Sequence, residues 1–304
     1  MKANVITLYE GHHHFGVAAL INSLVACGFD GKVSVYYKGE LPPWLDGLPR
    51  LPDGRFKIRG CILQFRKAQV RRHLGYHKPF AAWAEFEADP ECEAVVYADP
   101  DVIFVAPWEF FTNWIGMGVA LCLDLNFPYL SENHPWRKTW AGLLLRATGE
   151  KANASSQYAN SGFFGVARED RGFLFRWMTI TETFEAEGGN TTSFNMAQRH
   201  HPIVGDQDLM AVALMGGGEK VSMLGQEAMG FNWHNFILVH QIAMPKPWQK
   251  IHTWEALKGS PPPPGTALYQ KWENDPIAPY SAGRMFWKKI DYRVAQVLSR
   301  VWSR

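Results

Sequence analysis

The first forty residues constrain the fold most strongly, because they alternate between extended and helical patterns. Residues 4–9 (NVITLY) form a short apolar run rich in β-forming side chains. Residues 17–27 carry apolar side chains at helical spacing, and residues 32–37 (KVSVYY) are again β-rich. This strand–helix–strand order predicts a βαβ unit with parallel strands and a right-handed crossover.

The same alternation continues along most of the chain. Residues 94–98 (AVVYA) form a continuous apolar run, as expected for a strand with both faces of its sheet covered. We therefore predict an α/β fold, with a mixed but mostly parallel sheet flanked by helices. The other expected strands span residues 118–123, 161–167 and 236–240, and the expected helices span residues 80–88, 173–184 and 207–215.

Composition excludes several classes of protein. Hydrophobic residues make up 47% of the sequence and charged residues 20%, which excludes an intrinsically disordered chain. The formal net charge of +2 argues against a nucleic-acid partner. The four cysteines are far apart and without metal-type spacing, so we expect buried, reduced thiols. The first residues do not resemble a secretory signal, and we expect a cytoplasmic location.

The C-terminal residues differ in character from the rest. A proline run at residues 261–264 separates two expected domains, residues 1–260 and residues 261–304. Residues 284–304 place apolar side chains at helical spacing, and six basic residues oppose one acid, Asp291. One interpretation is a helix lying on an anionic membrane at its inner face. The other is a terminal helix packed on the core with a solvated basic face.

Two carboxylates follow the expected strand at residues 94–98. Asp99 and Asp101 flank Pro100, and in extended backbone this spacing puts both side chains on one side of the chain. Because proline cannot donate to a sheet ladder, the pair lies at the end of the strand, where α/β proteins bind ligands. Two close carboxylates repel each other unless a cation neutralises them, which favours a divalent-metal site. The alternative is a turn with solvated acids.

A histidine and a lysine follow the last expected strand of the sheet. His240 closes an apolar run, and Lys246 lies six residues later between two prolines. A neutral imidazole can complete a carboxylate metal site, and an ammonium group supplies a point charge for phosphate. The prolines stiffen the loop and reduce the entropy lost in placing that charge. The alternative is a core histidine followed by an ordinary surface loop.

Two further motifs combine small and polar side chains. Asn160 and Gly162 enter a β-rich run, and a short amide beside a glycine suits hydrogen bonding to sugar hydroxyls. The same residues are equally typical of a strand with a bulge. Asp206 and Asp208 precede a helical pattern, where aspartate is more commonly a helix cap.

In this order and spacing, the four motifs resemble those of the retaining glycosyltransferases of the glycogenin-like and lipopolysaccharide galactosyltransferase family (glycosyltransferase family 8). The resemblance covers about residues 5–248 in element order, and it implies a GT-A fold. It also implies that Asp99, Asp101 and His240 bind a metal ion. Mixed oxygen and imidazole ligation fits Mn²⁺ better than Mg²⁺, which stays the alternative ion.

The resemblance implies roles for the donor-binding residues as well. Lys246 matches the lysine that contacts the donor diphosphate. Asn160 and Gly162 fall where the family holds the donor sugar, and Lys78 matches a basic donor-binding residue. From its position at the end of the first strand, Tyr9 is expected to stack on uracil.

The catalytic residues implied by the resemblance are Asp206 and Gln207. They match the Asp-Gln pair that lies beside the reacting sugar carbon, and we expect them to stabilise an oxocarbenium-like sugar. The implied reaction is transfer of a hexose from a UDP-hexose to a glycan or lipid-linked glycan, with retention. We expect the acceptor to meet a loop within residues 124–140.

The sequence departs from the family pattern at two positions, which favour a binding protein as one alternative, and an inverting transferase is a second. Ala243 replaces a glycine of the histidine motif, and Pro100 divides the acidic pair. One alternative is an inverting GT-A transferase, with Asp206 or Asp208 as general base. The other is a weakly active or inactive protein that binds glycans or nucleotide sugars on the same fold. Three consecutive histidines at residues 12–14 are expected to form a polar loop at the cleft or to contact a substrate.

Overall fold

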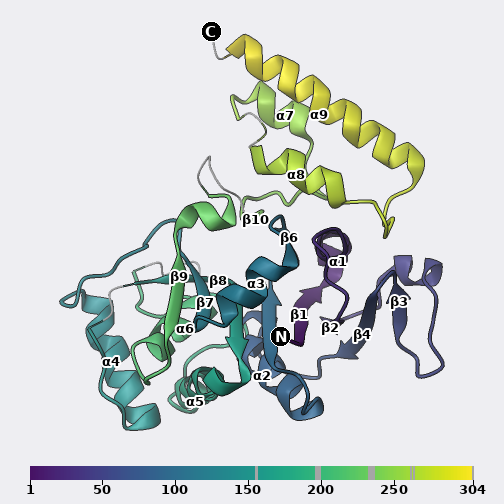
Figure 1. The fold of residues 1–304 in the computed structure, drawn as a ribbon. Coiled ribbons are helices and arrows are strands. Elements are labelled where there is room, and N and C mark those ends of the chain that lie inside the picture. Colours follow the sequence, from purple (N-terminus) through teal and green to yellow (C-terminus); the bar gives the residue numbers. More distant parts are fainter. Residues whose placement is uncertain (155–156, 196–199, 232–236, 261, 263, 303–304) are drawn as a thin grey trace.

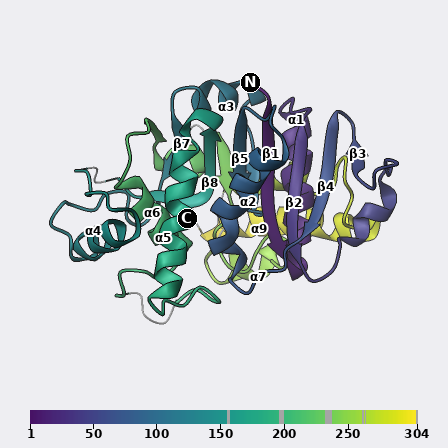
Figure 2. The same cartoon turned by 90° about the horizontal axis from the view of Figure 1, so that it is seen from below.

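The structure is a computed structural model that describes residues 1–304 apart from 155–156, 196–199, 232–236, 261, 263 and 303–304. An eight-stranded sheet in the order β3-β4-β2-β1-β5-β8-β7-β9 forms its centre, and Figure 2 shows most of these strands side by side. The strands are β1 (Ala3–Glu10), β2 (Lys32–Lys38), β3 (Phe56–Ile58), β4 (Cys61–Lys67), β5 (Ala94–Ala98), β6 (Val102–Phe104), β7 (Val119–Leu123), β8 (Ala159–Ala167), β9 (Val221–Leu224) and β10 (Leu238–His240).

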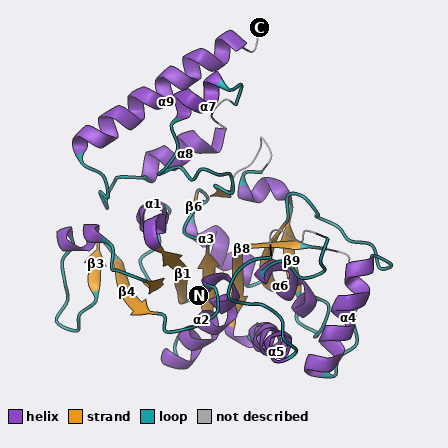
Figure 3. Cartoon of the chain, turned by 180° about the vertical axis from the view of Figure 1, so that it is seen from behind, coloured by secondary structure: helices purple, strands orange, loops and turns teal. Residues whose placement is uncertain are grey.

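The α-helices cover the sheet and form a separate layer near the C-terminus (Figures 1 and 3). They are α1 (His14–Ala26), α2 (Leu74–Ala88), α3 (Trp108–Ile115), α4 (Pro135–Thr148), α5 (Gly172–Ala186), α6 (Asp206–Leu214), α7 (His252–Leu257), α8 (Pro264–Trp272) and α9 (Ala282–Trp302). The predicted α/β fold is confirmed, since β1 pairs in parallel with β2 across α1 and with β5 on its other side. Within the eight-stranded sheet, β3 and β8 run against the other strands.

The sheet is buried on both faces, which explains its almost continuously apolar strands. Ile6 and Leu8 of β1 contribute to a core that includes residues of α2, α4, α5 and α6. Val5 and Tyr9 point the other way, into a core that includes residues of α1 and α3. Alternating side chains therefore serve two cores, as expected for a sheet covered by helices on both sides.

Two predicted elements differ from the structure at their ends. The helix expected from residue 80 begins at Leu74, where the ring of His73 accepts a hydrogen bond from the Gly75 amide (3.1 Å). Pro79 lies inside this helix, and burial of Tyr76 on the core offsets the loss of one backbone donor. Of the strand expected at residues 236–240, Phe236 lies outside the described residues, and β10 pairs antiparallel with β6 rather than joining the main sheet.

The C-terminal residues pack on the body of the protein. The Asn22 amide in α1 donates to the carbonyls of Trp272 (2.7 Å) and Ile277 (2.9 Å), and its oxygen accepts from the Ile277 amide. Tyr269 and Tyr280 are buried in a third core together with residues of α1, β6 and β10. The proline run, of which Pro261 and Pro263 lie outside the described residues, therefore does not detach the chain that follows. A domain boundary at residue 261 stays a prediction.

We expect Asn22→Ala to lower the free energy of unfolding by at least about 2 kcal/mol, because it leaves buried backbone groups of Trp272 and Ile277 without partners. Denaturant unfolding followed by circular dichroism measures this change. Ser34→Ala is the matched control, since the buried Ser34 hydroxyl has no hydrogen-bond partner among the described residues. Equal stability of the two variants would contradict the proposed docking of the C-terminal residues through Asn22.

Candidate metal centre and substrate cavity

The two acids and the histidine come together where three short segments meet. Asp99 and Asp101 follow β5, and Asp101 leads directly into β6. Because β10 pairs with β6 so that His240 lies opposite Val102, the imidazole is held next to Asp101. The Asp101 carbonyl also accepts a hydrogen bond from the Gln241 amide (3.0 Å), which fixes the end of this ladder.

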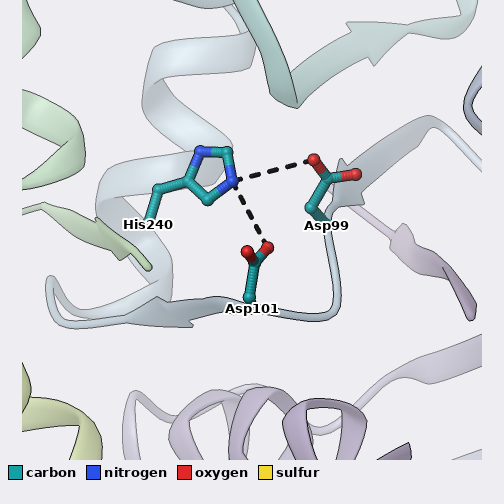
Figure 4. Close-up of side chains that lie close together, drawn as sticks. All are labelled: Asp99, Asp101 and His240. Atoms are coloured by element: carbon teal, nitrogen blue, oxygen red, sulfur yellow. Dashed lines mark ion pairs between the residues drawn. The ribbon is translucent and has the colours of Figure 1, made fainter. Parts of the chain in front are cut away.

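One oxygen of each carboxylate faces the imidazole. His240 Nε2 lies 3.3 Å from Asp101 Oδ1 and 3.7 Å from Asp99 Oδ2. Figure 4 marks both contacts with dashed lines. One ligand atom from each of the three residues lies within 4.8 Å of the other two. Gly162 makes room for the ring, because a Cβ atom there would lie 2.3 Å from His240 Cε1. The three side chains thus converge on one point, and only glycine fits beneath them.

The remaining carboxylate oxygens are held by other groups. The Tyr97 hydroxyl donates to Asp99 Oδ1, and the Lys78 ammonium lies 3.2 Å from the same oxygen. Lys246 Nζ lies 2.5 Å from Asp101 Oδ2. Each acid is therefore fixed through one oxygen, and the other oxygen is directed towards His240.

This donor set fits a divalent cation. Two carboxylates and one imidazole are ligands that Mn²⁺ accepts readily. A solvated acid does not describe Asp101, which is only 4% exposed, whereas Asp99 is partly buried. Burial opposes ionisation of Asp101, but His240 and Lys246 outweigh burial, and the pKa of Asp101 lies below its ordinary value. The three side chains could therefore hold a divalent metal ion.

A cavity of about 480 Å³ opens beside this cluster, at the carboxyl ends of β1 and β5. Lys78, Asp99, Asp101, Asp206 and Lys246 all line it. Lys78 Nζ bridges Asp99 to Asp206, 2.8 Å from Asp206 Oδ2. Burial disfavours the charged ammonium, but these two carboxylates more than offset it, and the pKa of Lys78 is raised. Together with Tyr9, six of the predicted site residues therefore line one cavity.

A second cavity of about 540 Å³ adjoins the first and shares Asp206 and Phe194 with it. Gln207 lines this second cavity, and its Oε1 accepts a hydrogen bond from the Ser161 amide (3.2 Å). Asp208 accepts from the Tyr158 hydroxyl (2.6 Å) and from the amides of residues 204 and 205. Asp208, the third residue of α6, thus caps the N-terminus of this helix, the role that the sequence offered for it.

Three predicted donor-binding residues have other contacts in the structure. Tyr9 lines the first cavity, but it is only 2% exposed and its hydroxyl donates to the Glu40 carbonyl (2.9 Å). Asn160 donates to Asp124 (3.1 Å) and accepts from the Gly162 amide (2.9 Å). Gly162 lies beneath His240. Contact of these three residues with a donor stays a prediction.

Two residues of the site were not predicted from the sequence. Tyr97 positions Asp99, and Ser161 accepts from Lys78 through its carbonyl (3.0 Å) and its hydroxyl (3.2 Å). Tyr97 and Asp99 are two positions apart at the end of a strand, so alternation alone would have put them on one side. The partner of Ser161 lies 83 residues away in the sequence, and no local pattern reveals it.

Comparison with known proteins supports the fold. No protein-family model matches the sequence, and no curated protein matches it. Among solved structures, the chain is similar to the galactosyltransferase LgtC, a member of glycosyltransferase family 8 solved in complex with donor and acceptor sugar analogues. The two share 14% identity with a TM-score of 0.53, over 94% of this chain and 99% of LgtC. The predicted GT-A fold is confirmed.

We expect Asp101→Asn to weaken Mn²⁺ binding at least ~10- to 100-fold, because it removes a charged ligand atom directed at the site. Loss of a residue that only supports a metal ligand already costs that much. Titration of Mn²⁺ followed by electron paramagnetic resonance measures the affinity. Asp124→Asn is the matched control, as Asp124 is similarly buried but does not belong to the candidate metal cluster. Unchanged Mn²⁺ affinity in Asp101→Asn would exclude the metal assignment.

Proposed function

We propose that this chain transfers a hexose from a UDP-hexose to a glycan acceptor, with a divalent cation and with retention of the anomeric configuration. The observation that supports it best is the cluster of Asp99, Asp101 and His240 beside a cavity that Lys246 also lines, in a GT-A fold. That LgtC was solved with donor and acceptor sugar analogues supports the same class of substrates here.

The charges in the cavity suit a nucleoside diphosphate bound together with a cation. Three carboxylates, of Asp99, Asp101 and Asp206, face two ammonium groups, of Lys78 and Lys246. Adding a divalent ion to these three carboxylates and two ammonium groups makes the net charge of the cluster positive. A positive cluster complements the diphosphate of a UDP-sugar. Asp99, Asp101 and His240 would hold the ion, which would supply Lewis-acid stabilisation of the negative charge on the departing UDP. We propose Mn²⁺ over Mg²⁺ because one of the three ligands is an imidazole.

The lysines have different tasks in this proposal. Lys246 donates to the carbonyl of Gln241 (3.0 Å) besides contacting Asp101, and it is only partly buried. Its ammonium is therefore available to the diphosphate once Asp101 contacts the cation. Lys78 is fully enclosed between Asp99 and Asp206, so its task is to hold these two carboxylates in place next to the donor sugar.

The contacts of α6 favour retention. An inverting transferase needs a free carboxylate to take the proton of the acceptor hydroxyl. Asp206 is paired with Lys78, and Asp208 accepts from Tyr158 and two backbone amides. Gln207 lines the second cavity, and its contact with the Ser161 amide uses only the side-chain oxygen. We propose that the Gln207 side chain stabilises the oxocarbenium-like sugar.

The second cavity is the proposed acceptor site. Phe127 and Trp136 offer aromatic surface, and Asp124 and Asn126 offer polar atoms, a combination typical of sugar sites. All four lie within residues 124–140, the segment that the sequence indicated, with Trp136 in the first turn of α4. The acceptor class we propose is a glycan or a lipid-linked glycan.

We also propose that α9 lies on an anionic membrane, which makes the protein a peripheral one at the cytoplasmic face. No described helix is long and apolar enough to cross a bilayer. On α9, Phe286 and Trp287 are 60% and 67% exposed, and Val294 and Val297 are exposed as well. Exposed basic residues of the same helix, including Lys289 and Arg293, complement anionic lipid.

Purified protein should release UDP from UDP-galactose or UDP-glucose in the presence of Mn²⁺ and a glycan acceptor. We expect Lys246→Ala to lower kcat/KM about 100-fold, because the leaving diphosphate loses a charged donor. Lys250→Ala, which removes a lysine from the same loop, is the matched control and should keep activity near that of the wild type. A coupled assay for UDP measures both.

Other results would favour the alternatives. Tight Mn²⁺-dependent binding of UDP-sugar with neither transfer nor hydrolysis would identify a binding protein on this fold. A product of inverted anomeric configuration, read by nuclear magnetic resonance, would identify an inverting transferase and contradict the role proposed for Gln207.

Vesicle sedimentation tests the membrane proposal. We expect the double substitution Phe286→Ser and Trp287→Ser to reduce binding to vesicles containing phosphatidylglycerol at least about tenfold, since each aromatic side chain buries apolar area in the interface. Phe175→Ser changes a comparably exposed phenylalanine (57%) on α5 and should bind as the wild type does. Equal binding of all three proteins would exclude α9 as the membrane-facing element.

A further inference from the structure

A third cavity, of about 630 Å³, lies next to the substrate cavity and belongs to neither proposed substrate site. The three consecutive histidines mark the division, since His13 lines the substrate cavity whereas His12 and His14 line the third one. The other walls come from the segment at residues 43–47, the loop after β10 and the first turn of α9. Its principal lining side chains are those of His12, His14, Phe15, Trp44, Trp248 and Arg284.

The polar side chains of this cavity suit an anion. No aspartate or glutamate is among the described residues that line it. The Arg284 guanidinium lies over the rings of Phe15 (5.2 Å) and Tyr280 (4.9 Å) and makes a 3.5 Å contact with the Trp248 carbonyl. It forms no ion pair with any described carboxylate, so most of its donors are free for a ligand.

The histidines add hydrogen-bonding groups rather than fixed charge. Burial, and then the neighbouring His12, lower the pKa of His14 to about 4, so that His14 is neutral at pH 7. An anion bound beside the ring would favour the protonated form. Arg284 is therefore the main charge of the cavity near neutral pH.

The aromatic walls are preformed. Trp44 and Trp248 are each more than nine-tenths buried. The Trp44 indole donates to the His14 carbonyl (3.2 Å), and Trp248 packs on Gly16, where a Cβ atom would lie 2.7 Å from its ring. Such fixed walls lower the entropy lost when a ligand is ordered.

The position of Arg284 indicates where the anion comes from. Arg284 begins the helix whose Phe286 and Trp287 are exposed two and three residues later. We propose that this cavity binds the phosphate of an anionic phospholipid headgroup, with Arg284 and His12 as the polar contacts and Trp44 as apolar wall. The assignment of the phosphate to a lipid rests on the proposed membrane association. The affinity of the cavity for a phosphate group does not depend on that proposal.

The test uses monomeric short-chain lipids, so that it requires neither a bilayer nor transferase activity. Dihexanoyl phosphatidylglycerol, dihexanoyl phosphatidylcholine and inorganic phosphate are titrated into the full-length protein by isothermal calorimetry. We expect phosphatidylglycerol to bind best, and Arg284→Gln to raise its dissociation constant about tenfold or more. Arg293→Gln, which removes an exposed charge of α9 outside the cavity, should leave it unchanged within about twofold.

Controls separate this proposal from the preceding ones. Arg284→Lys keeps the charge and should restore much of the binding, which a variant that merely unfolds would not do. Donor hydrolysis by Arg284→Gln should equal that of the wild type. Equal binding of phosphatidylglycerol and phosphatidylcholine, or an equal effect of both arginine substitutions, would overturn the site. Inorganic phosphate binding as tightly as phosphatidylglycerol would overturn its assignment to lipid.

Discussion

Repulsion among Asp99, Asp101 and Asp206 is the constraint on which the rest of the site depends. Three carboxylates share one cavity wall, and each is largely or wholly removed from water. Such a cluster persists only when cations compensate it. Lys78 joins two of the acids and Lys246 contacts the third, so the elements that carry these lysines, α2 and the loop after β10, must come to the ends of the strands.

Close approach of the backbone makes this arrangement sterically feasible. Gly162 leaves room for the His240 ring, and Gly16 leaves room for the Pro100 carbonyl, which a Cβ atom would approach to 2.1 Å. Both glycines lie where β5, β6, β8 and α1 meet. The same packing brings Trp248, which lines the cavity that contains Arg284, against Gly16 of α1.

Acidic and basic side chains gather in two different parts of the molecule. The substrate cavities contain the clustered acids, whereas α9 and the cavity beside it contain exposed basic and aromatic side chains. A protein with this division can hold a cation and a diphosphate at one place while it binds an anionic surface at another. The near-zero net charge of the whole chain conceals this division.

The sequence by itself determined the α/β class, because periods of two and of 3.6 residues are local properties of β1, α1 and β2. It also determined the candidate ligands Asp99 and Asp101, whose spacing at the end of a strand is local too. Only the tertiary structure decided which oxygen of each acid is free, that Lys78 bridges Asp99 to Asp206, and that Asn22 holds the C-terminal residues on α1. These contacts join residues 21 to 255 positions apart, and their geometry follows from packing rather than from any local pattern.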